Sequence, residues 1–242
     1  MHRVMNNDMA KMDLGRPIGI YMEESTNMKI YIAFLRGINI SGKNKVPMAE
    51  LKKAFEELGG GAVKTYLNSG NVIFSSGEDN IGSLTSRIEV MIKDRFGLDI
   101  PVFVISKEDL EDILQHAPDW WGDENKEIYD NLIFIMPPAT FAELWGEIGE
   151  PKEGLEKIKD YKETVFWSFS RKDYQKTNWW PKTASTNISR KLTIRTANTV
   201  RKIVGMCLFS AIQLIASYFK ESLSGTCTDK ASVKWCFSTI CA

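Results

Sequence analysis

The body of this chain lacks cysteine. The sequence has 242 residues and four cysteines, all of them near the end of the chain. These are Cys207, Cys227, Cys236 and Cys241. A body without cysteine has no disulfide framework, which is typical of a protein of the reducing cytoplasm. The terminal cysteines also lack the close pairs of a zinc site, so we expect no metal and no cofactor.

The chain also has a formal net charge of zero and only two histidines. The 31 basic and 31 acidic residues balance, so the whole surface does not attract long nucleic acid, and such a role needs a local basic patch. His2 lies in an N-terminal extension, and His116 lies at the predicted end of a helix, most simply on the surface. No Ser-His-Asp or Cys-His arrangement can be drawn in the body, which leaves open whether the protein is an enzyme.

Both ends of the chain lie outside the two predicted halves. Residues 1–27 mix charged and polar side chains and have no apolar core of a signal peptide, so we predict a disordered extension over residues 1–28. Residues 203–219 are largely apolar but short for a membrane span, which favours a packed C-terminal helix over a tail anchor. We predict that residues 206–242 form this helix and a disordered or artefactual tail, and that the protein is cytoplasmic with no membrane contact.

Residues 29–106 alternate strand and helix patterns. The predicted strands are Lys29–Leu35, Val63–Leu67, Val72–Ser75 and Pro101–Ile105, and the predicted helices begin at Pro47 and Ile81 and end near Gly59 and Gly97. This order, β-α-β-β-α-β, is that of a ferredoxin-like unit. Because a crossover helix joins parallel strands, the loop after the first strand, the turn at residues 68–71 and the connection at residues 97–100 should meet at one end of the sheet.

Residues 107–205 repeat this order more loosely. The predicted strands are Leu132–Met136, Leu155–Ile158, Thr164–Phe169 and Lys191–Arg195, with helices at Phe141–Ile148 and from Thr196. The predicted fold class is therefore α+β, with two ferredoxin-like halves, mainly antiparallel sheets and helices packed on one face. The other faces should be covered by each other or by a second copy of the chain, as in a homodimer.

The loop after the first strand carries the strongest chemical signal. Residues 37–44 nearly match the phosphate-binding pattern G-x-x-x-x-G-K-[ST], but Asn44 lacks the hydroxyl that binds magnesium, so we do not predict a P-loop. A looser anion site fits better. Arg36 offers a planar fork for phosphate or carboxylate, and Lys43 and Lys45 add point charges.

Other polar residues at the strand ends have two interpretations. Loop asparagines and glycines commonly serve only left-handed backbone and local hydrogen bonds, which is the favoured interpretation for residues 68–71. Trp179 and Trp180 could face a ligand, although burial is favoured for them as for Trp120 and Trp121. The candidate anion-binding residues are Arg36, Gly37, Asn39, Gly42, Lys43, Asn44, Lys45, Asn68, Ser69, Asn71, Arg195, Asn198 and Thr199.

Several motifs together resemble one bacterial family, the domain of unknown function 1697. They are Leu35-Arg36-Gly37-Ile38-Asn39, Gly42-Lys43-Asn44-Lys45-Val46, Tyr66-Leu67-Asn68-Ser69-Gly70-Asn71-Val72 and Leu192-Thr193-Ile194-Arg195. The resemblance covers roughly residues 29–205. It implies a bacterial cytoplasmic protein of two related α+β halves, and it implies no reaction.

Three functions remain open from the sequence. The first is binding of a phosphorylated small molecule or nucleotide at the loop cluster, with long nucleic acid less favoured. The second is an enzyme acting on such a molecule, in which Arg36, Lys43 and Arg195 stabilise developing charge. The third is a dimeric structural or interaction module.

Overall fold

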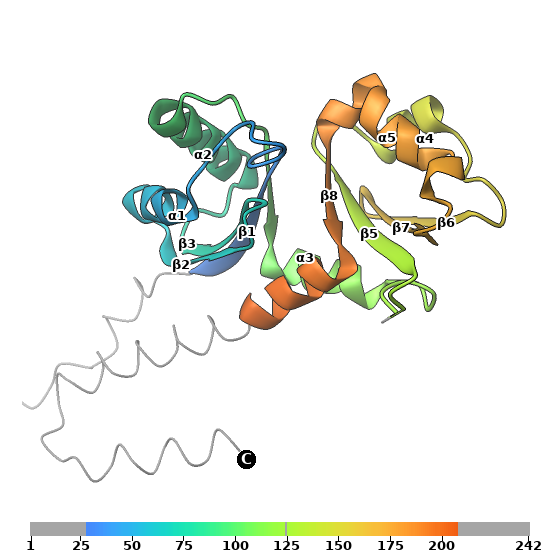
Figure 1. Ribbon diagram of the computed structural model, residues 1–242. Coiled ribbons are helices and arrows are strands. Elements are labelled where there is room, and N and C mark those ends of the chain that lie inside the picture. Colours follow the sequence, from blue (N-terminus) through green and yellow to red (C-terminus); the bar gives the residue numbers. More distant parts are fainter. Residues whose placement is uncertain (1–27, 124, 208–242) are drawn as a thin grey trace, which may run out of the picture.

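The structure, a computed structural model, describes residues 28–123 and 125–207 (Figure 1). The tails predicted over residues 1–28 and 206–242 lie outside the described residues except for residues 28, 206 and 207. The first part of the chain contains β1 (Lys29–Leu35), α1 (Met48–Glu57), β2 (Gly61–Tyr66), β3 (Asn71–Ser76), α2 (Ile81–Phe96) and β4 (Val102–Ser106). Helix α3 (Lys107–Gln115) then connects to the second part.

The second part repeats the same sequence of elements. It contains β5 (Ile128–Ile135), α4 (Phe141–Ile148), β6 (Glu156–Tyr161), β7 (Thr164–Ser170), η1 (Tyr174–Lys176), α5 (Trp179–Ser185), η2 (Asn187–Lys191) and β8 (Leu192–Thr196). A terminal helix follows and is described over residues 197–207. No helix among the described residues is both long and apolar enough to cross a membrane.

The strands form two four-stranded sheets within the described residues. Their orders are β2-β3-β1-β4 and β6-β7-β5-β8, and all neighbouring strands are antiparallel. Each sheet therefore places its own second, third, first and fourth strands in the same order. Strands β1 and β2 are parallel to each other because each is antiparallel to β3 between them. The division of the chain into domains at residue 106 stays a prediction.

The central strands are buried on both faces, which explains their continuous apolar sequences. In β1, Tyr31, Ala33 and Leu35 pack under α1 and α2, whereas Ile32 and Phe34 face the second sheet. Strand β5 divides its side chains in the same way between the helices of its own half and the first sheet. Figure 1 shows that α1 and α2 cover the outer face of the first sheet, and that α4 and α5 cover the outer face of the second.

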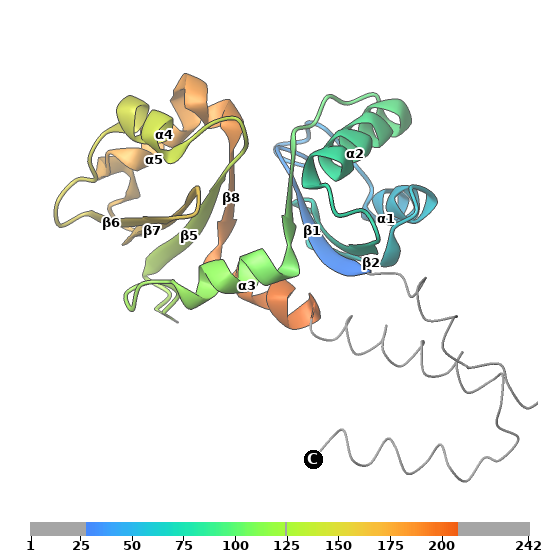
Figure 2. The same cartoon turned by 180° about the vertical axis from the view of Figure 1, so that it is seen from behind.

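The inner faces of the two sheets share one apolar core. The rings of Phe34 and Phe134 stack with their centroids 4.8 Å apart. Helix α3 and the terminal helix run across the open end of this core and contribute Leu110, Ile113 and Val200 (Figure 2). The prediction that helices pack on one face was therefore wrong for these two helices, because two apolar inner faces need a cover at their shared end. The homodimer stays a prediction.

Several predicted boundaries shift by a few residues. Strand β5 begins at Ile128 instead of Leu132, because Asp130 and Asn131 are polar and do not read as strand interior. Strand β6 runs from Glu156 to Tyr161, whereas the sequence predicted a strand over Leu155–Ile158. Helix α1 begins at Met48, with Pro47 in extended backbone before it. None of these shifts changes the order of the elements.

Candidate anion site at the junction of the two halves

The loop after β1 folds into a small hairpin. Ser41 and Gly42 both have left-handed backbone, with φ of 50° and 77°, and Lys43 N donates to the Ile40 carbonyl oxygen at 2.9 Å. Two left-handed residues in this position are the signature of a type I′ turn. The tip is exposed, and the Ile40 residue is 60% accessible. The near match to the phosphate-binding pattern therefore lies in a hairpin and not at the start of a helix.

Asparagine side chains hold this hairpin in place. Asn39 Nδ2 donates to the carbonyl oxygens of Val46 and Asn68, both at 2.9 Å, and its Oδ1 accepts from Val46 N at 2.9 Å. Asn44 Nδ2 donates to the Gly37 carbonyl oxygen at 3.0 Å. These amides brace the loop from within, so the structural interpretation of loop asparagines applies to Asn39 and Asn44.

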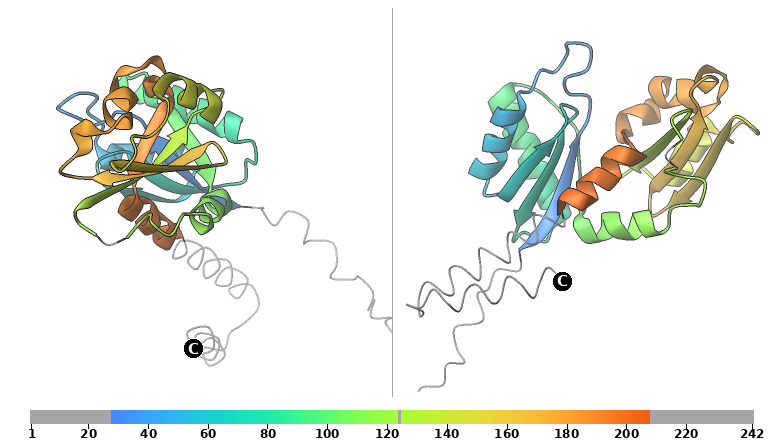
Figure 3. Two further views of the ribbon diagram at one scale, coloured as in Figure 1. Left: turned by 90° about the vertical axis from the view of Figure 1, so that its right-hand side faces the viewer. Right: turned by 60° about the horizontal axis from the view of Figure 1, so that its bottom comes forward.

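Three loops meet at this end of the first sheet, as the predicted topology required. Leu35 N donates to the Gly70 carbonyl oxygen at 2.8 Å, and Arg36 N donates to the Pro101 carbonyl oxygen at 3.0 Å. Figure 3 shows the hairpin loop standing out beyond the first sheet. Asn39, Ser41, Asn44 and Leu67 all adopt left-handed backbone here, a conformation that costs about 1 kcal/mol for a residue with a side chain.

Arg36 reaches from the first sheet to the second half. Its Nε donates to the Leu192 carbonyl oxygen and its Nη2 to the Ser189 carbonyl oxygen, both at 3.0 Å. Its Nη1 makes no hydrogen bond within the described part of the chain. Lys43 and Lys45 are exposed, and neither forms an ion pair with a described residue. Positive charge therefore gathers at this end without a carboxylate partner among residues 28–123 and 125–207.

Arg195 makes the reverse connection, from β8 to the first sheet. Its Nε donates to Asn71 Oδ1 at 2.6 Å, and its Nη2 donates to the carbonyl oxygens of Leu35 at 2.9 Å and Ser69 at 3.2 Å. Its Nη1 donates to Thr193 Oγ1 and to the Ile194 carbonyl oxygen, both at 2.9 Å. All five N–H groups of the guanidinium are thus used.

Partial burial of this guanidinium among neutral groups has an electrostatic cost. Desolvation lowers the pKa of Arg195 to about 10. The side chain lies over the Phe34 ring at 5.1 Å, and all of its hydrogen-bond acceptors are uncharged oxygens. Asn71 is fully buried and also donates to the Tyr66 carbonyl oxygen at 2.8 Å. Arg195 therefore joins the halves and has no N–H left for a ligand.

The remaining predicted site residues lie elsewhere or carry backbone contacts. Gly37 and Gly42 have left-handed backbone in the hairpin loop. Thr199 N donates to Thr196 Oγ1 at 3.3 Å, which caps the terminal helix. Asn198 lines a separate cavity at the other end of β8. The structure thus brings Arg195 to the loop cluster but leaves Asn198 and Thr199 away from it.

The tryptophan pairs are largely internal. Trp179 is fully buried and donates from its indole N–H to the Gly149 carbonyl oxygen at 3.0 Å. Trp180 is 41% exposed, but its ring contacts Tyr174 at 4.9 Å between centroids. Trp121 is buried as well. Burial, the favoured interpretation, holds for Trp121 and Trp179.

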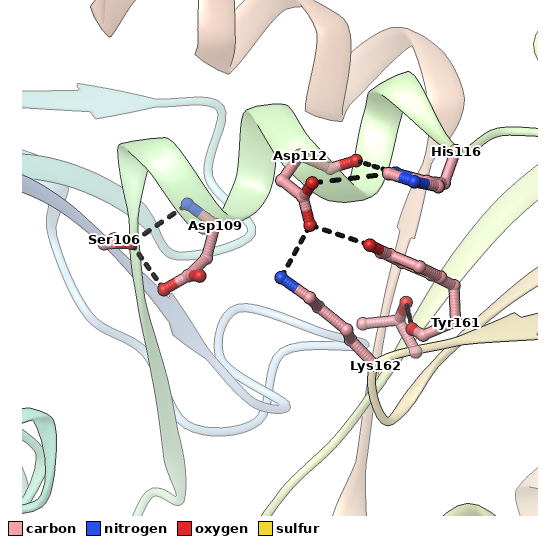
Figure 4. A network of polar contacts seen from close by, with 7 residues as sticks. Ser106, Asp109, Asp112, His116, Tyr161 and Lys162 are labelled. Carbon is pink, nitrogen blue, oxygen red and sulfur yellow. Dashed lines mark hydrogen bonds and ion pairs between the residues drawn. The ribbon is translucent and has the colours of Figure 1, made fainter.

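A polar network around α3 was missed by the sequence reasoning (Figure 4). Asp112 Oδ2 accepts from Lys162 Nζ at 2.6 Å and from the Tyr161 hydroxyl at 3.0 Å. His116 stacks on the Tyr161 ring with centroids 4.1 Å apart. The Lys162 ammonium holds the pKa of Asp112 below its usual range. The spacing of Asp112 and His116 on one helix face was visible in the sequence, but the partners on the β6–β7 turn were not.

With this architecture in place, the comparisons identify its class. The family model "Protein of unknown function (DUF1697)" matches residues 28–166, and the chain belongs to this family. A solved structure of the conserved bacterial protein SP0830 from Streptococcus pneumoniae is similar over 74% of this chain and 98% of its own, with 30% identity and a TM-score of 0.66.

Two further comparisons add little. The crystal structure of an unknown protein from Galdieria sulphuraria aligns over 70% of this chain and 97% of its own, with 10% identity and a TM-score of 0.23, which carries no argument about fold. No curated protein matches the chain. The comparisons thus show the family and an α+β fold, and the family description assigns no function.

Proposed function

We propose that this protein binds a phosphorylated small molecule, such as a nucleotide or a sugar phosphate, against the hairpin loop at the junction of the two halves. One observation carries the proposal. Arg36, Lys43 and Lys45 gather at one end of the first sheet, and none of them pairs with a carboxylate within the described residues. A phosphate group supplies the missing negative charge.

The partly buried charge of Arg195 supports this electrostatic argument. A guanidinium bonded only to neutral oxygens keeps its full positive charge, and the partly desolvated surroundings screen that charge less than water does. Arg195 thus raises the positive potential near Asn71 and Ser69 without touching the ligand. In this proposal Arg36 Nη1, Lys43 and Lys45 make the direct contacts.

The shape of the loop supports the proposal as well. Asn39 and Asn44 hold the hairpin in one conformation through side-chain hydrogen bonds, so binding does not have to order it. Left-handed residues with side chains concentrate at functional sites more often than elsewhere. Four such residues lie in this cluster: Asn39, Ser41, Asn44 and Leu67.

The same geometry favours binding over catalysis. The described partners of Arg36 are backbone carbonyls, and no acid or base is hydrogen-bonded to it. The balanced net charge favours a small ligand over long nucleic acid. The proposal treats each half as a ferredoxin-like unit, which the repeated strand order supports. It also places the protein in the cytoplasm, which the cysteine-free body supports.

The test is a binding titration of the full chain with pyrophosphate, ATP, ADP and glucose 6-phosphate, first by thermal shift and then by calorimetry. The variant carries Lys43→Ala and Lys45→Ala, at two exposed positions that form no ion pair with a described residue. We expect it to lose affinity at least about tenfold while its melting temperature without ligand stays unchanged.

The matched control removes two exposed lysines from α1 instead, Lys52→Ala with Lys53→Ala, and should bind like the unchanged protein. If none of the four compounds raises the melting temperature, the proposal is wrong. A short single-stranded oligonucleotide is titrated in parallel, and if it alone raises the melting temperature, the site recognises nucleic acid rather than a small phosphorylated ligand.

A further inference from the structure

A separate cavity lies in the second half. It is found at the end of β8 opposite to Leu192, the residue that Arg36 contacts. A cavity of about 350 Å³ is lined there by Asp123, Asn125 and Lys126, by the start of β5, by Arg171 and by the first turn of the terminal helix. None of the features proposed above to contact phosphate lines it. It therefore stands independently of the proposed function.

The cavity exists because two paired strands differ in length. Strand β8 ends at Thr196, which pairs with Asn131 of β5. Residues 128–130 of β5 extend beyond this pair, and no strand of the described residues pairs with them on that side. Figure 1 shows β5 and β8 diverging toward this end. An uncovered strand edge leaves backbone polar groups able to bind a ligand.

Asp130 presents a buried carboxylate to this cavity. The residue is only 8% exposed, and the Ser168 hydroxyl donates to its Oδ1. Its Oδ2 accepts no hydrogen bond from the described residues, yet it is not among the polar atoms sealed from solvent. The free oxygen therefore opens toward the cavity that Asp130 lines. A buried carboxylate with one hydroxyl partner is poorly compensated, which favours a cationic donor from outside.

Arg171 supplies the opposite charge in the same cavity. Its guanidinium lies over the Tyr129 ring at 4.2 Å, which fixes the orientation of the side chain. It forms no ion pair with a described residue, although Asp130 lines the same cavity. The start of the terminal helix, at Ala197 and Asn198, adds the positive end of a helix dipole.

We propose that this cavity binds a small zwitterionic molecule of amino-acid size. The ligand's ammonium group donates to Asp130 Oδ2, and its carboxylate pairs with Arg171 near the helix start. The volume suits a molecule of this size, and separate groups of opposite charge select a ligand that carries both charges.

The test titrates the full chain with the common L-amino acids by ligand-observed NMR and calorimetry. The amino acid that binds best is then compared with the amine that lacks its carboxylate and with the acid that lacks its amino group. Asp130→Asn removes the charge but keeps the volume and an acceptor for Ser168, and Arg171→Gln removes the guanidinium. We expect each variant to lower affinity for the zwitterion at least about tenfold.

The matched controls change exposed residues of the same charge that do not line the cavity. Asp160→Asn and Lys172→Gln should leave affinity unchanged, and melting curves establish that all variants fold. Asp130→Asn should weaken binding of the amine and leave binding of the acid unchanged. Arg171→Gln should weaken binding of the acid and leave binding of the amine unchanged. Absence of binding by any amino acid at about 10 mM, or binding insensitive to Asp130→Asn, overturns the proposal.

Discussion

The two halves share a strand order but leave their first strands in different ways. After β1 the chain makes the protruding hairpin with Lys43 and Lys45. After β5 it turns tightly instead: Ala139 N donates to the Met136 carbonyl oxygen at 3.1 Å, and Thr140 caps α4 in a capping box with Glu143. The same topology thus carries a cationic loop in one half and a closed connection in the other. The proposed site is therefore a property of the loop and not of the fold.

Each half also sends one arginine side chain across the junction to bond with the other half. Arg36 donates to two carbonyl oxygens of the second half, whereas Arg195 spends all five N–H groups, three of them on the first half. This difference separates two roles that look alike in sequence. Arg195 is a structural link, and Arg36 keeps donors that a ligand can use.

Replacing Arg195 should give the largest effect. Arg195→Ala leaves Asn71 Oδ1 and the Leu35 carbonyl oxygen without donors in a buried environment. We expect it to lower the free energy of unfolding by about 3 kcal/mol, since each unsatisfied buried group costs about 1–3 kcal/mol. Arg36→Ala should cost only about 1 kcal/mol, because it breaks two partly exposed bonds. Urea unfolding measures both values.

A conservative change sharpens this test. Arg195→Lys keeps the charge but cannot reproduce five donors in a plane, so it should recover less than half of the lost stability. If Arg36→Ala and Arg195→Ala destabilise the protein equally, the distinction between the two arginines fails. Full rescue by lysine would show instead that charge, and not hydrogen bonding, holds the junction.

The sequence predicted the meeting of the loops because that follows from strand order alone. Crossover connections fix which strand ends share an edge, so Arg36 and the 68–71 turn could be placed together. The hydrogen-bond partner of each loop side chain could not be predicted. Whether Asn39 serves a ligand or Val46 depends on a loop conformation that propensities do not determine.

The Asp130 cavity had no local signal in the sequence. It arises because β8 stops before the start of β5 is paired, and this mismatch depends on the register between strands far apart in sequence. The polar residues Tyr129, Asp130 and Asn131 also prevented the sequence pattern from predicting that β5 begins at Ile128. The alternation of apolar and polar residues within one strand does not predict how that strand pairs with another strand far away in the sequence.

A smaller effect is expected at Leu67, in the turn of the first half. Its φ of 56° is strained for leucine, and the residue is 53% exposed, so little packing is lost on truncation. Leu67→Gly should raise the free energy of unfolding by up to about 1 kcal/mol, because glycine adopts this conformation without steric cost. Thermal and urea unfolding measure the change.

The matched control is Leu67→Ala, which shortens the side chain but keeps the Cβ that causes the strain. It should give no gain in stability. If alanine and glycine stabilise the protein equally, exposure of the leucine and not its backbone explains the effect, and strain is not a distinguishing feature of the loop cluster.

The smallest effect concerns the network that ties α3 to the second half. Lys162 lowers the pKa of Asp112, so the carboxylate contributes stability above the pKa it has in the unfolded chain, about 3.9, and loses it as pH falls through its lower folded value. Asp112→Asn should therefore make the melting temperature fall less steeply between about pH 5 and pH 3 than in the unchanged protein. Asp160→Asn, at an exposed position on β6, is the control and should keep the original slope. Equal slopes for Asp112→Asn and the unchanged protein would mean that α3 is held to the second half by its apolar contacts at Leu110 and Ile113 and not by this ion pair.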